Sequence, residues 1–499
     1  MRRDQIHRML AAGIALFAGA AGLIAQEPPA PAQPAGRPRT LIVSLDDALK
    51  LAAGESETVW VAQAGVMRAV GNQRIARSGF FPQITGSASY TRTLRSQFSG
   101  LDFGGGGSNL PFGRENQYSL SLSLSQLLFD AGQTAARHRA TQAQRRAAEI
   151  GVDSALAATF LDVTQAYFDA QLGDRLVEIA EASLAQTEET LRVTEVAFKV
   201  GDKAEFDVLR ARVTRDNQLP VLIRRRTDRS EAYLRLKQLL EVPAGDELVL
   251  TTAVADPVPR FAKASDASPE RRAPVRQAAE NVSAGEAQVD EAEAQRLPAV
   301  RLTSQYSPVA YPASGLPRRS DFREDWSVTL GLTVPILTWG RLRGNVMVAQ
   351  GTLSEARARL EQTREAAALE AQTARDALAE AEATLAGNTS TVEEAQHAYQ
   401  ISQVRFREGI SAQIELSDAQ LQLEQAQVNR ALALRDVQVA RARLALLENL
   451  PLGTGTGAAT QQIQIPQGST QPITTQPAQP IASASPLLGG GTTRTGSQQ

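Results

Sequence analysis

The chain has 499 residues, a formal net charge of -2 and no cysteine. A charge this close to zero, with no long basic run, argues against a nucleic-acid partner. The absence of cysteine excludes disulfides and thiolate metal sites, and the three histidines, His7, His138 and His397, are too scattered to indicate a zinc site. We therefore expect no cofactor and no metal site.

The first 25 residues have the layout of a secretory signal peptide. Arg2 and Arg3 precede a short apolar run, Met9–Ala25, and a segment rich in proline and alanine follows over residues 26–40. We expect cleavage near Ala25 and export of the mature chain, with a hydrophobic anchor helix as the alternative. No later apolar stretch reaches the roughly 18 residues of a membrane-spanning helix, so a mature protein that crosses a membrane would do so with strands.

The rest of the chain consists of two similar halves and a tail. The aligned segments are Tyr118–Gly132 with Trp326–Gly340, Ala197–Ala211 with Arg405–Ala419, and Phe81–Tyr90 with Leu297–Tyr306. The first two pairs are separated by 208 residues and the third by 216, and the difference falls in loops, where length changes cost little. We expect repeat 1 over 41–240, a linker over 241–266, repeat 2 over 267–450 and a disordered tail over 451–499.

The first half is expected to contain three helices and two strands. Its strands alternate apolar and polar residues, and its long helix of 69 residues would measure about 100 Å at 1.5 Å per residue. The two shorter helices together match the long one in length, which predicts that they lie end to end beside it. Pro220 should kink the last helix, because proline removes a hydrogen bond. In chain order, these elements are a helix over Ser44–Phe80, strands over 84–93 and 117–128, a long helix over Gly132–Val200 and a helix over Ala204–Leu240.

The second half repeats this order. The expected elements are a helix over Ala267–Leu297, strands over 299–307 and 326–336, a long helix over Gly340–Glu408 and a helix over Ala412–Leu450. Apolar residues in the helices recur at coiled-coil spacing, as Leu421, Val428, Leu432 and Val439 do. We therefore expect a rod of antiparallel helices with the strands at one end and tight turns at the other.

The strands raise the question of what covers their apolar face. In YSLSLSLSQLLFDAG, from Tyr118, leucines fall on one face and serines on the other. The apolar face comprises Leu120, Leu122 and Leu124 in the first half and Val328, Leu330 and Leu332 in the second. An ordinary sheet covered by helices is one interpretation. Lipid is the interpretation we favour, because the helical pattern of the remaining chain leaves little to form a sandwich.

Four strands cannot form a stable membrane sheet alone. An open sheet in lipid leaves unpaired backbone groups at both edges, at several kcal/mol each. Closing a barrel takes about eight strands, so several chains must pool theirs, with leucine facing lipid and serine facing a water-filled lumen. Aromatic residues at the strand ends fit the two membrane interfaces. They are Phe80, Phe81, Tyr118, Phe129 and Trp326.

The sequence resembles the outer membrane efflux protein (TolC) family over roughly residues 41–450. The resemblance rests on the duplication, the strand endings FDAG and LTWG, and a pattern of aromatic-x-x-G followed by an acidic residue and alanine in Phe198–Ala211 and Phe406–Ala419. It implies an α-helical coiled-coil barrel in the periplasm plus a transmembrane β-barrel in the outer membrane of a Gram-negative-type cell. Each chain would supply four strands, and trimerisation would close the barrel.

The resemblance also implies a function in which the chain catalyses no reaction. Such a homotrimer is the passive exit duct of a tripartite efflux or type I secretion system, and it docks a periplasmic adaptor (membrane fusion protein) and an inner-membrane pump. Consistent with this, no catalytic motif appears in the sequence, and we expect no enzyme. A non-catalytic periplasmic coiled-coil scaffold is the alternative function; it accounts for the helical seams but not for the strands and the signal peptide together.

Two groups of residues are the candidate sites. Adaptor docking is expected at the turns between helices, although glycine at these positions also fits a simple turn. The turns are formed by Val200, Gly201 and Asp202 and by Glu408, Gly409 and Ile410. The resemblance places a periplasmic gate at Glu415 and Asp418, which share a helix face, and Asp207 corresponds to Glu415 in the first half. Ordinary solvated carboxylates are the alternative interpretation of all three.

Overall fold

The computed structural model describes residues 40–95, 115–256, 258–261, 268–312 and 316–453. The expected signal peptide and nearly all of the expected tail fall outside these ranges. Every element described below belongs to one compact unit, Met1–Thr454, and a second unit, Gly455–Gln499, lies wholly outside the described residues. The described part is mostly helical and carries an antiparallel sheet.

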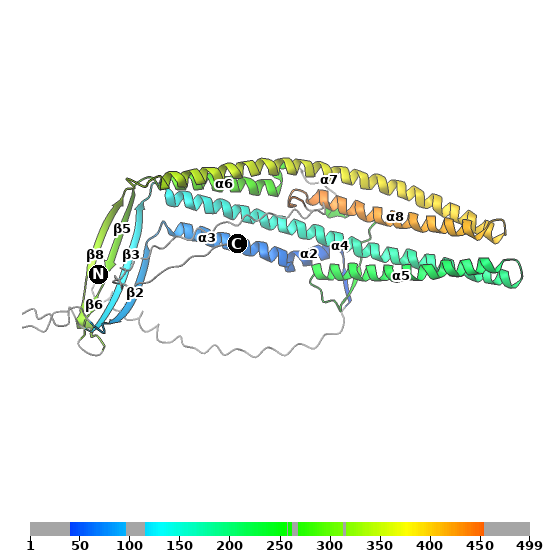
Figure 1. Ribbon diagram of the computed structural model, residues 1–499, viewed down its shortest axis with the longest axis horizontal. Helices are drawn as coiled ribbons and strands as arrows, with labels where there is room; N and C mark the ends of the chain where they lie inside the picture. The colour runs from blue at the N-terminus through cyan, green and yellow to red at the C-terminus, as the bar shows by residue number, and fades with distance from the viewer. Residues whose placement is uncertain (1–39, 96–114, 257, 262–267, 313–315, 454–499) are drawn as a thin grey trace, which may run out of the picture. The chain divides into compact units, whose positions relative to one another are not determined.

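Two helices of 67 residues each, α4 (Gln133–Lys199) and α7 (Arg341–Arg407), are the longest elements (Figure 1). Both are rich in Ala, Gln, Glu and Arg, which lose little conformational freedom in a helix. Each begins directly after a glycine with left-handed backbone, Gly132 (φ 89°) or Gly340 (φ 87°), a conformation that glycine adopts without a steric penalty. In the first half, the Asp130 carboxylate accepts hydrogen bonds from backbone N–H groups at the start of α4.

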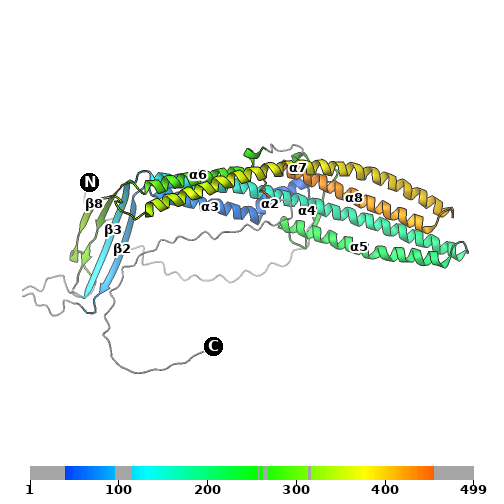
Figure 2. The ribbon, with the colours of Figure 1, turned by 45° about the horizontal axis from the view of Figure 1, so that its top comes forward.

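Five shorter helices accompany the two long ones. They are α2 (Leu45–Glu55), α3 (Glu57–Ser78), α5 (Glu205–Leu239), α6 (Ala273–Ala294) and α8 (Gln413–Leu446). In Figures 1 and 2, α3, α2 and α5 follow one another along α4, and α6 and α8 do so along α7. Among the described residues, none of these helices combines the length and apolar character that crossing a bilayer requires.

Two details of the shorter helices differ from the sequence-based expectation. The single helix expected over Ser44–Phe80 is interrupted at Ser56, whose backbone is extended (φ -64°, ψ 121°), so that α2 and α3 are separate helices. The helix expected to kink at Pro220 continues through that residue as one element, α5. The Ser44 hydroxyl accepts a hydrogen bond from the N–H of Asp47 and caps the start of α2.

The helices pack side by side in a fixed lateral order. α3 and α5 pack on α4, α4 packs on α6 and α8, and α6 and α8 pack on α7. Figure 1 shows this order from α3 and α5 at the lower side to α7 at the upper side. The unit therefore has two lateral edges, one formed by α3 and α5 and the other by α7.

The main sheet has four long strands in the antiparallel order β2, β3, β5, β8. They are β2 (Gln83–Arg92), β3 (Asn116–Phe129), β5 (Ala299–Tyr306) and β8 (Trp326–Thr333). Two short strands, β6 (Val309–Ala310) and β7 (Phe322–Arg323), extend the sheet, with β6 paired to β3 and β7 paired to β6. The sequence predicted the four long strands and missed these extensions, because two-residue strands have no readable alternation.

A second, parallel pair of strands was also not predicted from the sequence. β1 (Thr40–Val43) pairs with β4 (Glu247–Leu250), inside the segment expected to be a linker. The pair lies beside the largest apolar core cluster, to which Tyr167 and Phe168 of α4 contribute fully buried rings. The Tyr167 hydroxyl donates to the carbonyl of Val43 (3.1 Å) and accepts from a backbone N–H next to β4. The described residues around β4 are therefore a structured part of the unit.

The two hairpins of the main sheet have matching registers. In the first, Gln83 pairs with Ser125, and in the second, Ala299 pairs with Thr333. Ala299 follows Gln83 by 216 residues, and Thr333 follows Ser125 by 208 residues. These are the same two offsets that relate the halves in the sequence. Corresponding residues of the two halves thus occupy corresponding places in the sheet.

Candidate functional site

The turn between α4 and α5 is built around a left-handed glycine. Gly201 has φ 84°, and the N–H of Asp202 donates to the carbonyl of Ala197 (2.9 Å). The N–H of Gly201 donates to the carbonyl of Phe198 (3.0 Å), so the last carbonyls of α4 are satisfied within the turn. The glycine at this position therefore has a backbone reason, independent of any docking role.

The turn between α7 and α8 has the same geometry. Gly409 has φ 71°, the N–H of Ile410 donates to the carbonyl of Arg405 (2.8 Å), and the N–H of Gly409 donates to that of Phe406 (3.2 Å). We call residues 196–214 and 401–420 the two tips. Their turns lie at the same end of the helices in both views (Figures 1 and 2).

The two tips contact one another directly. The Lys203 ammonium of the first tip lies 4.9 Å from the centre of the Phe406 ring of the second, a cation–π contact. The buried amide of Gln413 on α8 can donate to the carbonyl of Asp207 (2.9 Å) and accept from the N–H of Ala211 (3.2 Å), both on α5. These contacts tie the start of α8 to the start of α5.

The aromatic residues of the tips show how the two copies differ. Phe406 is 6% exposed and packs in a core with Tyr399, Leu416 and Leu423, whereas the corresponding Phe198 is 43% exposed. Burial in this core raises the pKa of the Tyr399 phenol, although the positive charge of Arg407 acts in the opposite direction. The second tip therefore has its own core, and the first tip presents its aromatic ring at the surface.

Large apolar side chains are exposed on both tips. On the first they are Val196, Phe198, Val200, Phe206, Leu209 and Val213, and on the second they are Ile401, Val404, Ile410 and Ile414. Large apolar side chains exposed together at one end of a protein are a feature of interaction sites. The expected docking residues Val200 and Ile410 belong to this surface.

The expected gate residues Glu415 and Asp418 lie on one face of α8, and both are exposed. Glu415 comes within 3.9 Å of Arg405 at the end of α7, a half-exposed pair that contributes little to stability. The Asp207 carboxylate accepts a hydrogen bond from the N–H of Ala204 (3.3 Å) at the start of its own helix, α5. Glu415 and Asp418 thus lie on α8, and Asp207 lies on α5.

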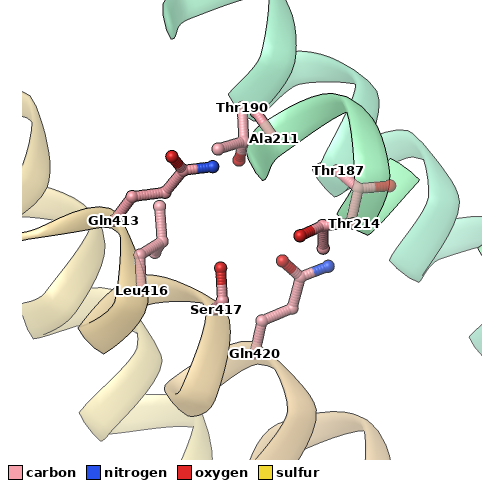
Figure 3. A pocket seen from close by; sticks show the side chains of 8 residues that line it. All are labelled: Thr187, Thr190, Ala211, Thr214, Gln413, Leu416, Ser417 and Gln420. Carbon is pink, nitrogen blue, oxygen red and sulfur yellow. The ribbon is translucent and has the colours of Figure 1, made fainter. Parts of the chain in front are cut away.

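A small polar cavity lies where α4, α5 and α8 meet (Figure 3). It is lined by Thr187, Thr190, Ala211, Thr214, Gln413, Leu416, Ser417 and Gln420. Its accessible volume of about 10 Å³ has room for about one water molecule. Figure 3 shows the amides of Gln413 and Gln420 and the hydroxyl of Ser417 directed across it, towards the threonines of α4 and α5.

A hydrogen-bond network continues from this cavity along the seam between α4 and α8. The Ser183 hydroxyl donates to the Glu424 carboxylate (2.7 Å), and the amide of Gln420 donates to the carbonyl of Ser183 (3.1 Å). The amide of Gln218 on α5 also donates to Glu424 (3.1 Å). This seam was not predicted from the sequence, although Gln413 and Gln420 are seven residues apart and so share a helix face.

The faces of the main sheet separate apolar from polar side chains. Leu120 and Leu122 are exposed, as are Leu330 and Leu332 on β8, whereas Leu124 is half-buried. In register between β2 and β3, the hydroxyls of Ser87 and Ser121 lie 2.9 Å apart, and those of Ser89 and Ser119 lie 2.7 Å apart. The alternation predicted from the sequence thus gives an uncovered apolar face and a hydrogen-bonded hydroxyl face.

Aromatic side chains lie at both ends of these strands. Phe80, Phe81 and Phe129 adjoin the helices, while Tyr118 and Trp326 lie at the far end, where Tyr118 stacks on Tyr90 with ring centres 4.7 Å apart. From Phe81 to Tyr90 the strand rises about 30 Å, or about 23 Å of height at a typical barrel tilt. This spacing matches the apolar band of about 25 Å that outer-membrane strands present to lipid.

No group of side chains among the described residues could hold a metal ion. The histidine at position 138 instead packs edge-on against Phe80, with ring centres 6.1 Å apart. His397 lies on an exposed face of α7.

Comparison with known proteins identifies the family. A model of the outer membrane efflux protein family matches residues 48–241 and 265–449. The chain is 28% identical over 335 residues to nodulation protein T of Rhizobium leguminosarum bv. viciae, covering 66% of this chain and 69% of that protein. It is 24% identical over 361 residues to the solvent efflux pump outer membrane protein SrpC of Pseudomonas putida, covering 71% and 74%.

Solved structures share the fold. The outer membrane protein VceC from Vibrio cholerae matches with a TM-score of 0.66 and 21% identity, covering 82% of this chain and 96% of that one. A membrane protein from Pseudomonas aeruginosa matches with a TM-score of 0.70 and 20% identity, covering 82% and 93%. The chain therefore belongs to the outer membrane efflux protein family, as a transport protein of the outer membrane whose helical part lies in the periplasm.

Proposed function

We propose that three copies of this chain close one β-barrel in the outer membrane, and that the barrel opens into a passive helical duct in the periplasm. The observation that carries this proposal is the main sheet. Its apolar face is uncovered, and β2 and β8 each have one neighbour among the described strands. Lipid is the environment that favours such a face, and unpaired edges in lipid cost several kcal/mol per backbone group. Lipid would cover the apolar face, and neighbouring copies would pair the edges at β2 and β8.

The stoichiometry follows from the number of long strands. One chain supplies four, which is fewer than the roughly eight needed to close the smallest barrels. Three chains supply twelve, enough for a lumen wide enough for water and solutes. The serine face of β2 and β3 would then line that lumen.

The duct is proposed to act in a tripartite efflux or type I secretion system. The tips, at the opposite end of α4 and α7 from the strands, carry exposed apolar side chains suited to docking a periplasmic adaptor, with an inner-membrane pump beyond it. SrpC, named as the outer membrane protein of a solvent efflux pump, supports an assembly of this kind. In such an assembly the pump supplies the energy and selects the cargo, and this chain performs no chemistry.

The most detailed part of the proposal is a gate at the tips. Glu415 and Asp418 share an exposed face of α8, so three chains would bring six carboxylates to one constriction. Like charges held close together attract cations. Asp207 corresponds to Glu415 in the first half, and its carboxylate accepts a hydrogen bond at the start of α5.

The channel proposal is tested by membrane extraction and by conductance. We expect the protein to resist extraction by urea, to purify as a trimer in detergent and to form a conducting pore in a planar bilayer. A periplasmic scaffold would be released by urea and would not conduct. Release by urea, or a monomer that does not conduct, would overturn the proposal.

Docking at the tips is tested separately. Gly201→Val and Gly409→Val place a β-branched residue at positive φ, which strains the turns although no atom lies within 4 Å of either added Cβ. We expect these two changes together to abolish transport while the trimer persists. Gly387→Val on α7, where an added Cβ also meets no atom within 4 Å, serves as the control away from the tips. Unchanged transport in the tip variant would show that docking occurs elsewhere.

A further inference from the structure

One arginine interrupts the otherwise neutral polar face of the main sheet. We infer that Arg301 of β5 and its counterparts in the other copies place a ring of positive charge inside the barrel, and that this ring favours the passage of anionic solutes. The inference rests on the proposed trimeric duct and adds to it a residue that determines which solutes pass.

The Arg301 side chain lies on the serine face of the sheet. Its guanidinium donates a hydrogen bond to the hydroxyl of Ser125 on the neighbouring strand β3 (3.0 Å), and the residue is exposed. Ser125 is the last of the alternating serines of β3, which occupy the face proposed to line the lumen. The charge of Arg301 is therefore on the lumen side of the sheet, opposite the apolar face.

The rest of this face is uncharged on the four long strands. The residues in register on it are Gln, Ser or Thr, apart from Leu127, Ala299 and Gly331. Among the residues of these four strands, all of which the structure describes, Arg301 is the single charge on the serine face. An ion that passes this stretch of the lumen therefore meets a field of one sign.

The charge of Arg301 is not neutralised by a carboxylate. Within the described ranges Arg301 forms no ion pair, whereas Arg139 at the start of the adjoining helix α4 pairs with Asp290 (2.9 Å). The residue opposite Arg301 on β8 is Gly331, which has no side chain to cover the guanidinium. Arg301 therefore keeps both its charge and its access to solvent, which are the two properties that attraction of anions requires.

The position of Arg301 along β5 places this charge where the barrel meets the helical duct. β5 begins at Ala299, so Arg301 lies about 7 Å from the end of the strand that follows α6 (Figure 1). Three copies would bring three guanidinium groups to one level. The equivalent residue of the first half, 216 positions earlier, is Thr85, so the charge is not part of the repeat.

Charge rings are an established means of selectivity in pores. Rings of Arg or Lys favour anions, and substitutions in the lumen of a barrel change its selectivity. The attraction acts through water, where salt screens it over about 10 Å at 0.1 M and about 3 Å at 1 M. The anion preference should therefore be clear at 0.1 M salt and fade at 1 M. A role of Arg301 limited to its hydrogen bond with Ser125 predicts no such dependence on salt.

Reversal potentials in a gradient of potassium chloride across a planar bilayer test the inference. Arg301→Gln removes the charge but keeps a donor for Ser125. It should lower the ratio of chloride to potassium permeability by roughly twofold to fivefold at 0.1 M salt, the scale expected for three unit charges about one Debye length away. Arg301→Lys keeps the charge and should keep the ratio of the unsubstituted residue.

A gain of charge at Thr85 provides a second test, which does not depend on whether Arg301 can be replaced. Thr85 pairs with Ser123 and so lies on the same serine face. Thr85→Arg should raise the ratio of chloride to potassium permeability, whereas Thr85→Gln, a neutral residue of increased length, should leave it unchanged. All these measurements are made on protein that also carries Glu415→Ala and Asp418→Ala, so that the acids proposed for the tips do not oppose the effect.

The outcomes separate this inference from the proposed function. A permeability ratio that changes in neither Arg301→Gln nor Thr85→Arg protein overturns the inference if those variants purify as trimers and conduct. A change that is equally large at 1 M salt also overturns it, because a screened charge cannot produce that result. In both cases the trimeric duct stands. If the unsubstituted protein does not conduct, the proposed function fails, and the charge ring fails with it.

Discussion

Replacement of Arg272 should be the most damaging single change in the helical part. This residue precedes α6, and its side chain is completely buried. Its guanidinium donates to the carbonyls of Leu447 (3.1 Å), Ala367 (3.3 Å) and Leu450 (3.2 Å) and to the Glu370 carboxylate (2.8 Å). It thereby joins the end of α8 and the middle of α7 to the start of α6.

The cost of Arg272→Met can be estimated from these contacts. Removing one partner of a buried ion pair costs about 3–5 kcal/mol, because the other charge remains buried. Glu370 keeps its contact with Arg443 (3.2 Å), which offsets part of the loss, but three carbonyls lose a charged donor. We therefore expect the free energy of unfolding to fall by about 4 kcal/mol. Arg272→Lys should be intermediate, because an ammonium cannot reproduce the planar fork.

The assay is urea unfolding of the detergent-purified protein, followed by the helical signal in circular dichroism. Arg271→Met is the control, because Arg271 is exposed and its ion pair with Glu448 (3.4 Å) is worth less than about 1 kcal/mol. The midpoint for Arg272→Met should fall well below that for Arg271→Met. Equal midpoints would refute the reasoning, since they would mean that the buried hydrogen bonds of Arg272 contribute no more than a surface pair.

Three further predictions concern the strands, the gate and a half-buried acid. Leu122→Asp should prevent assembly into an oligomer that survives heating on a gel, at a few kcal/mol per lipid-facing charge, whereas Ser123→Asp, on the face proposed to line the lumen, should assemble normally. The double change Glu415→Ala/Asp418→Ala should weaken both cation selectivity and block by multivalent cations in single-channel recordings. Unchanged values would show that the two residues are ordinary surface carboxylates and form no gate. Burial raises the pKa of the Glu291 carboxyl despite the positive charge of Arg137, so its ionised form disfavours folding above its unfolded pKa. Glu291→Gln should therefore raise the urea midpoint at neutral pH, with a gain that shrinks as the pH falls through the raised pKa; a gain independent of pH would rule out this cause.

The fold was readable where a pattern repeats over many residues. The alternation in β3 and the long helical stretches extend over enough residues for their period to be unmistakable. β1 and β4 have only four residues each and lie far apart in the chain, so their parallel pairing left no local signal. The break at Ser56 was equally invisible, because a single extended residue between two helical stretches does not interrupt their composition.

The candidate site was predictable to a smaller extent. The spacing of Glu415 and Asp418 was enough to place them on one face, because that depends on helix geometry alone. The engagement of Asp207 depends on the backbone at the start of α5, and the burial of Gln413 depends on a neighbouring helix that is distant in sequence. Arg272 likewise has partners 95 to 178 residues away, which no local pattern reveals.

The equal lengths of α4 and α7 constrain how this protein can change in evolution. Each is one uninterrupted helix of 67 residues between the sheet and a tip. Inserting one residue would advance the tip by 1.5 Å and rotate it by about 100° relative to the strands, turning buried faces outward. Inserting seven residues leaves a rotation error of only about 20°, which supercoiling can absorb. The distance from membrane to tip should therefore change by whole heptads, in both long helices and their shorter neighbours at once.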